Sequence, residues 1–85
     1  MGYFAHIDEN NIVQQVISIS NEVLNEPMFS FPDTEPLGRA FIAQTLGLDG
    51  EWRQTSFNGN FRGRYAGIGN RYDRDLDEFV PPVDE

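Results

Sequence analysis

The chain has 85 residues, a formal net charge of −8 and no cysteine, and all its positive side chains are arginine. This length predicts one domain, residues 1–85, which buries only about 60–65% of the surface that the unfolded chain exposes. Because disulfides and thiolate metal sites are excluded, oligomerisation or docking on a larger body is the remaining source of extra stability. The negative charge argues against duplex nucleic acid as a partner. No apolar run approaches the roughly 20 residues of a membrane span, and no signal-peptide pattern precedes the fold, so we expect neither membrane contact nor export.

Residues 1–20 predict a β-hairpin. In the first strand, one face carries Tyr3, Ala5 and Ile7 and the other carries Phe4, His6 and Asp8. The polar residues 8–11 predict the turn. In the second strand, from about Ile12 to Ser20, alternation places Val13, Ile17 and Ile19 on one face and Val16 on the other. His6 has no partner cysteine, histidine or serine motif, so we expect it to pack or to face water.

Residues 21–34 predict an ordered loop, which two prolines interrupt. Met28, Phe29 and Phe31 give this segment more apolar weight than a disordered linker has. We expect the loop to lie over the edge of the core. The alternative is an exposed apolar patch that docks on another protein.

Residues 35–46 predict the one helix of the chain. Thr34 is suited to the N-cap, and Gly47 is suited to the position after the last turn. One face carries Leu37, Ala40 and Phe41, while Ile42 and Leu46 project to a different side. Because one small sheet cannot cover both sides, the pattern predicts a second contact surface.

Residues 51–80 predict a β-rich region and residues 81–85 a frayed acidic tail. A third strand covers 51–57, the sequence Asn-Gly-Asn at 58–60 is a turn, and residues 78–80 form a last short strand. Between them, 61–72 is loop or loosened strand, and 73–77 is a polar turn. The order predicts an α+β fold, in which a small antiparallel sheet, made of the N-terminal hairpin and C-terminal strands, packs with one α-helix. We expect Trp52, the single tryptophan, in the main core.

The segment 52–72 carries four of the six arginines, five aromatic residues and no acidic residue. Arginine with aromatic residues is typical of surfaces that bind single-stranded nucleic acid. However, a chain this short needs most of its aromatic residues for a core, and its acidic residues offer partners for the arginines. Pairing within the chain or between subunits is therefore favoured over nucleic acid.

No motif for catalysis or for a cofactor is present. The glycines of 59–69 lack the lysine of a phosphate loop and the helix that should follow a dinucleotide fingerprint, so turns explain them. Asp73, Asp75 and Asp77 resemble the start of a calcium loop, but the glycine that should follow is Glu78. The chain has no lysine or cysteine, and its one histidine lacks a nucleophile motif. We expect no enzyme activity, no metal site and no cofactor.

Three segments carry a resemblance to known sequences: 4–17 (FAHIDENNIVQQVI), 37–52 (LGRAFIAQTLGLDGEW) and 52–82 (WRQTSFNGNFRGRYAGIGNRYDRDLDEFVPP). Together they resemble a group of small uncharacterised proteins of marine bacteriophages, including phages of cyanobacteria. The resemblance implies a phage origin, and some such proteins are suspected virion components. Related chains often continue past the two prolines, whereas this sequence ends at Glu85, so we expect contacts of that extension to be lacking.

We therefore expect a non-enzymatic phage structural or assembly protein, located in the virion or the host cytoplasm. It would act through protein–protein contacts, as a homo-oligomer or docked on other virion proteins. An acidic phage-encoded modulator that binds a host protein is the alternative. The candidate interface residues are Phe29, Phe31, Ile42, Leu46, Arg62 and Arg64.

Overall fold

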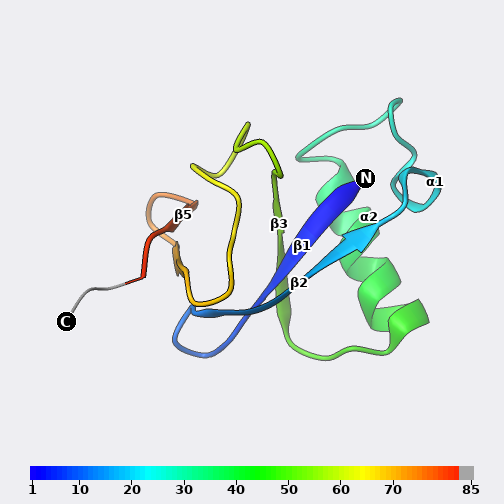
Figure 1. Ribbon diagram of the computed structural model, residues 1–85. Coiled ribbons are helices and arrows are strands. Elements are labelled where there is room, and N and C mark those ends of the chain that lie inside the picture. The colour runs from blue at the N-terminus through cyan, green and yellow to red at the C-terminus, as the bar shows by residue number, and fades with distance from the viewer. Residues whose placement is uncertain (83–85) are drawn as a thin grey trace.

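The computed structural model describes residues 1–82, and the expected tail at 83–85 lies outside the described residues. The elements follow in the order β1 (Gly2–Ile7), β2 (Val13–Ile19), α1 (Asn21–Leu24), α2 (Thr34–Phe41), η1 (Ile42–Leu46), β3 (Glu51–Thr55), β4 (Arg71–Asp73) and β5 (Glu78–Val80). Figure 1 shows the sheet in the centre, with α2 to its right and β5 to its left.

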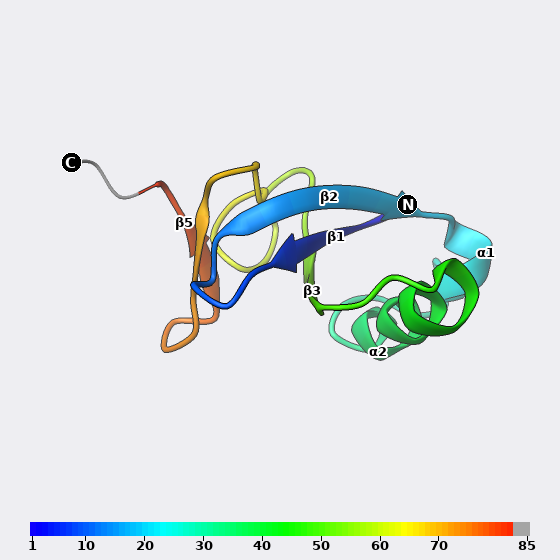
Figure 2. The same ribbon diagram turned by 90° about the horizontal axis from the view of Figure 1, so that it is seen from below.

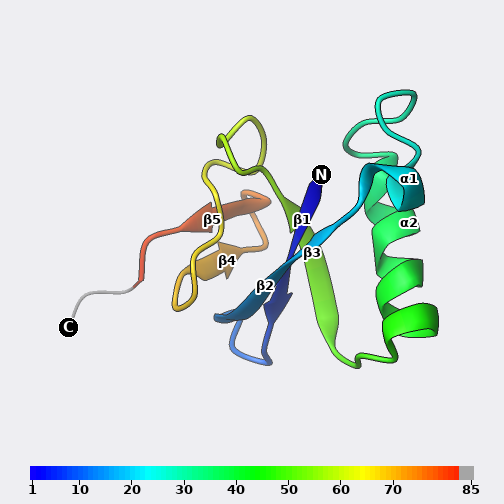
Figure 3. The same cartoon turned by 45° about the vertical axis from the view of Figure 1, so that its right-hand side comes forward.

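The strands form two antiparallel sheets. One has three strands in the order β2-β1-β3, and the other is the β4-β5 hairpin. Figure 3 shows the three-stranded sheet between α2 on one side and the small hairpin on the other. The predicted α+β fold is confirmed, including the N-terminal hairpin and the short last strand, which has the bounds that the sequence indicates.

Each face of the three-stranded sheet has its own core. On the helix face, Phe4 and Trp52 pack with residues of α1, β2 and η1; this cluster consists of Phe4, Ile19, Leu24, Ile42 and Trp52. On the hairpin face, the cluster consists of Ala5, Ile7, Val13, Ala66, Tyr72 and Phe79. The alternation predicted for β1 is therefore confirmed, and so is the burial of Trp52, which is 4% exposed. Covering both faces lets a chain of 85 residues bury two rows of side chains from one strand.

The predicted face of Val13 is wrong. The register between β1 and β2 shifts between His6 and Ile7, so that Gln15 lies opposite His6 but Val13 lies opposite Ile7. Gln14 is the extra residue of a β-bulge, which reverses the alternation at that point. Val13 therefore joins the hairpin-face core, together with Ile7.

The predicted helix is present as α2 followed by the single π-helical turn η1. Its buried residues are Thr34, Gly38 and Ile42, which recur at the helical spacing of four. A β-carbon added to Gly38 would lie 2.0 Å from Cζ of Phe4. The absence of a side chain at this position therefore lets the helix approach the sheet closely, and places Ile42 in the core.

The expectation that Thr34 caps the helix is wrong, since Thr34 is the first helical residue and Asp33 precedes it. The Thr34 hydroxyl is buried and donates a hydrogen bond of 2.7 Å to the side chain of Gln54. This bond fastens the start of α2 to β3.

Three other boundaries differ from the prediction. Residues 21–24 form the short helix α1 at the start of the predicted loop, and its Leu24 is fully buried. The third strand ends at Thr55, so Phe57 projects into solvent and is 63% exposed. Residues 61–70 contain no strand, because glycines with left-handed φ at positions 63 and 69 bend the chain there.

Candidate functional site: the two edges of the sheet

An ion pair closes the outer edge of β3 at Gln54. Glu35, from α2, accepts the backbone N–H of Gln54 at 2.7 Å, and Arg62 donates to the backbone carbonyl of Gln54 at 3.0 Å. The two side chains also form two hydrogen bonds with each other, one of them 3.1 Å long. Carboxylate and guanidinium thus take the places that a neighbouring strand would occupy.

Arg62 is held from every side. Its side chain is only 6% exposed, and its Nε donates to the Asp77 carboxylate at 2.9 Å. The guanidinium lies 4.8 Å from the centre of the Phe31 ring, which stacks on Phe61. Burial lowers the pKa of Arg62, but the hydrogen bonds and charge of Glu35 outweigh this effect and raise it, so the side chain remains a cation. All three nitrogens of this guanidinium donate hydrogen bonds within the chain, so the group serves the fold.

A second charged cluster surrounds Tyr72. The centre of this ring lies 5.5 Å from the guanidinium of Arg53 and 5.8 Å from that of Arg74. Both arginines bind the Glu51 carboxylate, and their hydrogen bonds, above all that of Arg74, lower the pKa of Glu51 to about 2. Burial, with the hydrogen bond to Asp77, raises the pKa of the Tyr72 hydroxyl. Of the four arginines of segment 52–72, Arg53 and Arg62 are therefore paired inside the chain.

The outer edge of β2 is open. The direction of its backbone groups follows from the hydrogen bonds of β3, through the alternation across the central strand β1. The backbone groups of Gln54 point away from β1, because they bond to the ion pair described above. Phe4, which lies opposite Gln54, therefore directs its N–H and C=O toward Ile17 on the other side. Hydrogen-bonded and non-hydrogen-bonded pairs alternate in antiparallel sheets. Val16 and Ser18, the two neighbours of Ile17, thus direct their backbone groups to the outer side of β2.

The open part of β2 begins after Val13. The N–H of Val13 donates to Asn70 at 2.8 Å, and its carbonyl accepts from Gly69 at 2.9 Å, so the loop before β4 covers the start of the strand. Among residues 1–82, no hydrogen bond reaches the outward backbone groups of Val16 or Ser18. In Figure 2, β2 borders the molecule on the side opposite α2.

The β2 strand, VQQVISI, also lacks the features that protect edge strands. It contains no charged residue and no proline, although the chain carries a net charge of −8. Natural proteins protect exposed edges with charges, prolines, bulges or covering segments. Here the bulge and the covering loop protect only the first residues, and the rest of the strand can accept another strand.

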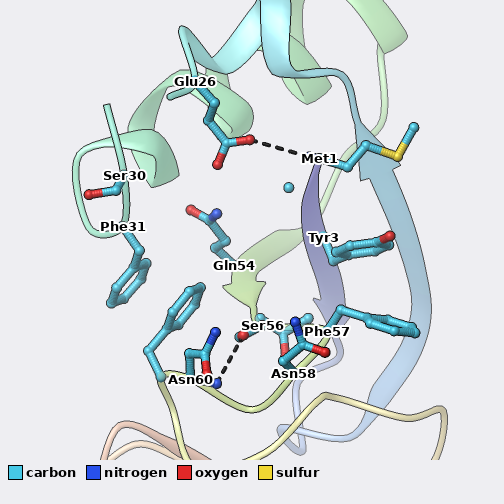
Figure 4. A pocket seen from close by; sticks show the side chains of 13 residues that line it. Met1, Tyr3, Glu26, Ser30, Phe31, Gln54, Ser56, Phe57, Asn58 and Asn60 are labelled. Carbon is cyan, nitrogen blue, oxygen red and sulfur yellow. Dashed lines mark hydrogen bonds and ion pairs between the residues drawn. The ribbon is translucent and has the colours of Figure 1, made fainter. Parts of the chain in front are cut away.

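Three aromatic rings lie on the hairpin face near this edge. The centres of the Tyr3 and Phe57 rings are 5.5 Å apart, and Tyr65 contacts both rings edge-on, at 5.9 and 5.4 Å. Tyr3 lies opposite Ser18 of β2, whose small side chain leaves space beside the ring. Figure 4 shows the rings of Tyr3 and Phe57 on the β2 side of β1, with Gln54 on the other side. We call Tyr3, Phe57 and Tyr65 the aromatic triad.

Tyr3 and Phe57 also line an open cavity of about 370 Å³, together with residues of the loop after α1. Amide and hydroxyl side chains line it, including Gln54, Ser30, Ser56 and Asn60, with Phe31 at the wall (Figure 4). These groups can donate and accept hydrogen bonds, but none of them is paired with a base as a nucleophile would be.

Two of the sequence-predicted interface residues lie inside the molecule, which corrects the prediction. Ile42 is 0% exposed because the helix approaches the sheet at Gly38. Arg62 is bound to acidic groups of its own chain and cannot set the register of a second subunit. Phe31 is half-buried between Phe61 and the guanidinium.

The other three predicted residues are exposed but do not lie in one patch. Phe29 is 43% exposed in the loop after α1, and Leu46 is 45% exposed at the end of η1. Arg64 is exposed between β3 and β4. The surface that combines free backbone groups with aromatic rings, β2 with the aromatic triad, was missed. The signal that could have found it is the uncharged run 13–19 in a strongly charged chain.

Within residues 1–82, no three histidine or acidic side chains are grouped as a metal site requires, and no helix is both long and apolar enough to cross a membrane. Asp73 and Asp77 have other partners: Asp73 accepts two backbone N–H groups of its own turn, and Asp77 binds Arg62 and Tyr72. Comparison with protein-family models, with curated proteins and with solved structures finds no match to this chain.

Proposed function

We propose that the protein is a non-enzymatic assembly component that acts through protein–protein contacts, with the open edge of β2 as its contact surface. The observation that carries this proposal is the difference between the edges. At Gln54 the β3 edge is closed by a nearly buried ion pair, and β3 also carries the charged residues Glu51 and Arg53, whereas the β2 edge presents free backbone groups on an uncharged strand. Pairing with an added strand is a common mode of recognition, in which backbone hydrogen bonds provide affinity and neighbouring side chains provide specificity.

A virion is the setting that we propose for this contact, on the strength of the resemblance to small phage proteins in the segments 4–17, 37–52 and 52–82. The alternative is a modulator that binds a host protein, for which the net charge of −8 is the supporting observation. Both functions use a protein surface, and they differ in where the chain is found after infection.

Mass spectrometry of purified virions tests the proposal. Phage that encodes the wild-type chain should contain it in stoichiometric amounts. Ser18→Pro removes an outward N–H from β2 and should abolish incorporation, whereas Ser18→Ala keeps that N–H and should be incorporated normally. Incorporation of the proline variant at the wild-type level would refute the role of the β2 edge. A wild-type chain found in infected cells but absent from virions would instead favour the host modulator.

A further inference from the structure

We infer that the strand added to β2 is β2 of a second copy of this chain, in an antiparallel pair centred on Ile17. This inference rests on the proposed role of the β2 edge and names its partner. The pair would join two three-stranded sheets into one continuous sheet across a two-fold axis, which is the commonest symmetry of oligomers.

Charge favours this arrangement. Two copies each carry a net charge of −8, so they repel one another overall. Residues 13–19 form an uncharged strip along the open edge. Two copies can therefore approach closely here without placing like charges opposite each other, which would destabilise the pair.

The register follows from the direction of the backbone groups. A two-fold axis at Ile17 places Val16 opposite the partner's Ser18, and Ser18 opposite the partner's Val16. Both residues direct their N–H and C=O outward, so each of these two pairs is hydrogen-bonded and together they give about four bonds. At the axis, Ile17 lies opposite its own copy in a non-hydrogen-bonded pair, where side chains approach most closely.

The side chains also suit this register. On the helix face, the half-buried Ile17 packs against its own copy and loses further apolar surface to water. On the hairpin face, the partner's Val16 lies beyond the small side chain of Ser18, which is paired with Tyr3 in the sheet. The aromatic triad, with Phe57 63% exposed, thus borders the new contact.

A single introduced thiol tests the register, because the chain contains no cysteine. In the pair centred on Ile17, the Cα atoms of the two copies of that residue lie about 4.5 Å apart, within disulfide range. Mild oxidation of Ile17→Cys should convert the chain to a covalent dimer, with a doubling of its mass. In the matched variant Gln15→Cys, the same register separates the two thiols by four residues along the strands. This is about 13 Å, too far for a disulfide, and the chain should remain uncrosslinked.

Sedimentation of the wild-type chain measures its oligomeric state directly, and this test does not depend on whether Ile17→Cys folds. We expect a dimer at tens of micromolar, and a monomer for Ser18→Pro with an unchanged circular dichroism spectrum. A wild-type monomer, or a disulfide yield as high for Gln15→Cys as for Ile17→Cys, would overturn the self-pairing. If the chain is monomeric but Ser18→Pro still loses virion incorporation, β2 serves a different protein: the proposed function survives and only this inference fails.

Discussion

Glu35 and Arg62, which lie 27 residues apart in the sequence, form a nearly buried ion pair that closes the outer edge of β3. The pair bonds to the backbone of one residue of that strand, at both its N–H and its carbonyl. It thereby fastens α2 and the loop before β4 to the same point of the sheet. The Arg62 guanidinium therefore helps to hold β3, α2 and the loop before β4 together.

Arg62→Ala should destabilise the protein by about 3–5 kcal/mol, because the change leaves the nearly buried Glu35 carboxylate without its cationic partner. Arg64→Ala is the matched control, since Arg64 lies two residues away and is exposed, and its loss should change the stability by no more than about 0.5 kcal/mol. Denaturant unfolding followed by circular dichroism measures both values. Equal stabilities for the two variants would show that the ion pair contributes nothing to the fold.

Gly38→Ala should destabilise the protein although alanine favours helices. The added β-carbon would lie 2.0 Å from Cζ of Phe4, and overpacking of this kind costs about 1–3 kcal/mol, more than the roughly 1 kcal/mol that helix propensity recovers. Phe4→Leu removes the ring atoms that clash. The double variant should therefore lose less stability than the two single variants together, and strict additivity would contradict the packing described here.

The hairpin, the last strand, the burial of Trp52 and the α+β class could be predicted from alternation, turn residues and composition. These signals are local. The face of Val13 could not be predicted, because the bulge at Gln14 depends on pairing with another strand. Ile42 was misplaced for a similar reason: its burial follows from the contact between Gly38 and Phe4, which are far apart in the sequence.

The site was harder to predict than the fold. Two arginines of segment 52–72, Arg62 and Arg64, were expected to contact another subunit. In the structure, Arg53 and Arg62 bind acidic groups of the same chain. Sequence shows that opposite charges are available but not which of them meet. The closure of the β3 edge at Gln54 depends on the position of Arg62 in three dimensions, which no local pattern encodes. For the open β2 edge, the uncharged run 13–19 is the signal that the sequence does carry.

The stability of the protein should depend on pH through Glu51. The pKa of this carboxylate is about 2 in the folded protein, against an ordinary value of 4.5, chiefly because of the hydrogen bond from Arg74. The ionised group therefore stabilises the fold fully above pH 4.5, and this contribution is lost as the pH falls from 4.5 toward 2. The pair is partly exposed, so added salt should reduce the effect.

Glu51→Gln isolates this contribution. Denaturation midpoints of the variant and the wild type should differ most above pH 4.5 and converge near pH 2. A difference that stays constant over this range would mean that Glu51 acts through packing and not through its charge.

Trp52 should report on the helix-face core. Its indole is 4% exposed and donates to the carbonyl of Asp49 at 3.2 Å, so the native protein should emit at shorter wavelength than an indole in water. Trp52→Ala should destabilise the protein by about 3–5 kcal/mol, a large share of the stability of a small domain. Native emission at the wavelength of the urea-unfolded chain would contradict the burial.

Amide hydrogen exchange at Val16 and Ser18, followed residue by residue at increasing protein concentration, tests the role of the β2 edge most directly. Both N–H groups point outward from the sheet, so they should exchange rapidly in dilute protein and become protected as copies pair. The N–H of Ile17 bonds within the sheet and should be protected at every concentration, which provides an internal control. Protection of Val16 and Ser18 that rises with concentration is the predicted result. Rapid exchange of both at the highest attainable concentration, with Ile17 still protected, would contradict self-pairing at this edge.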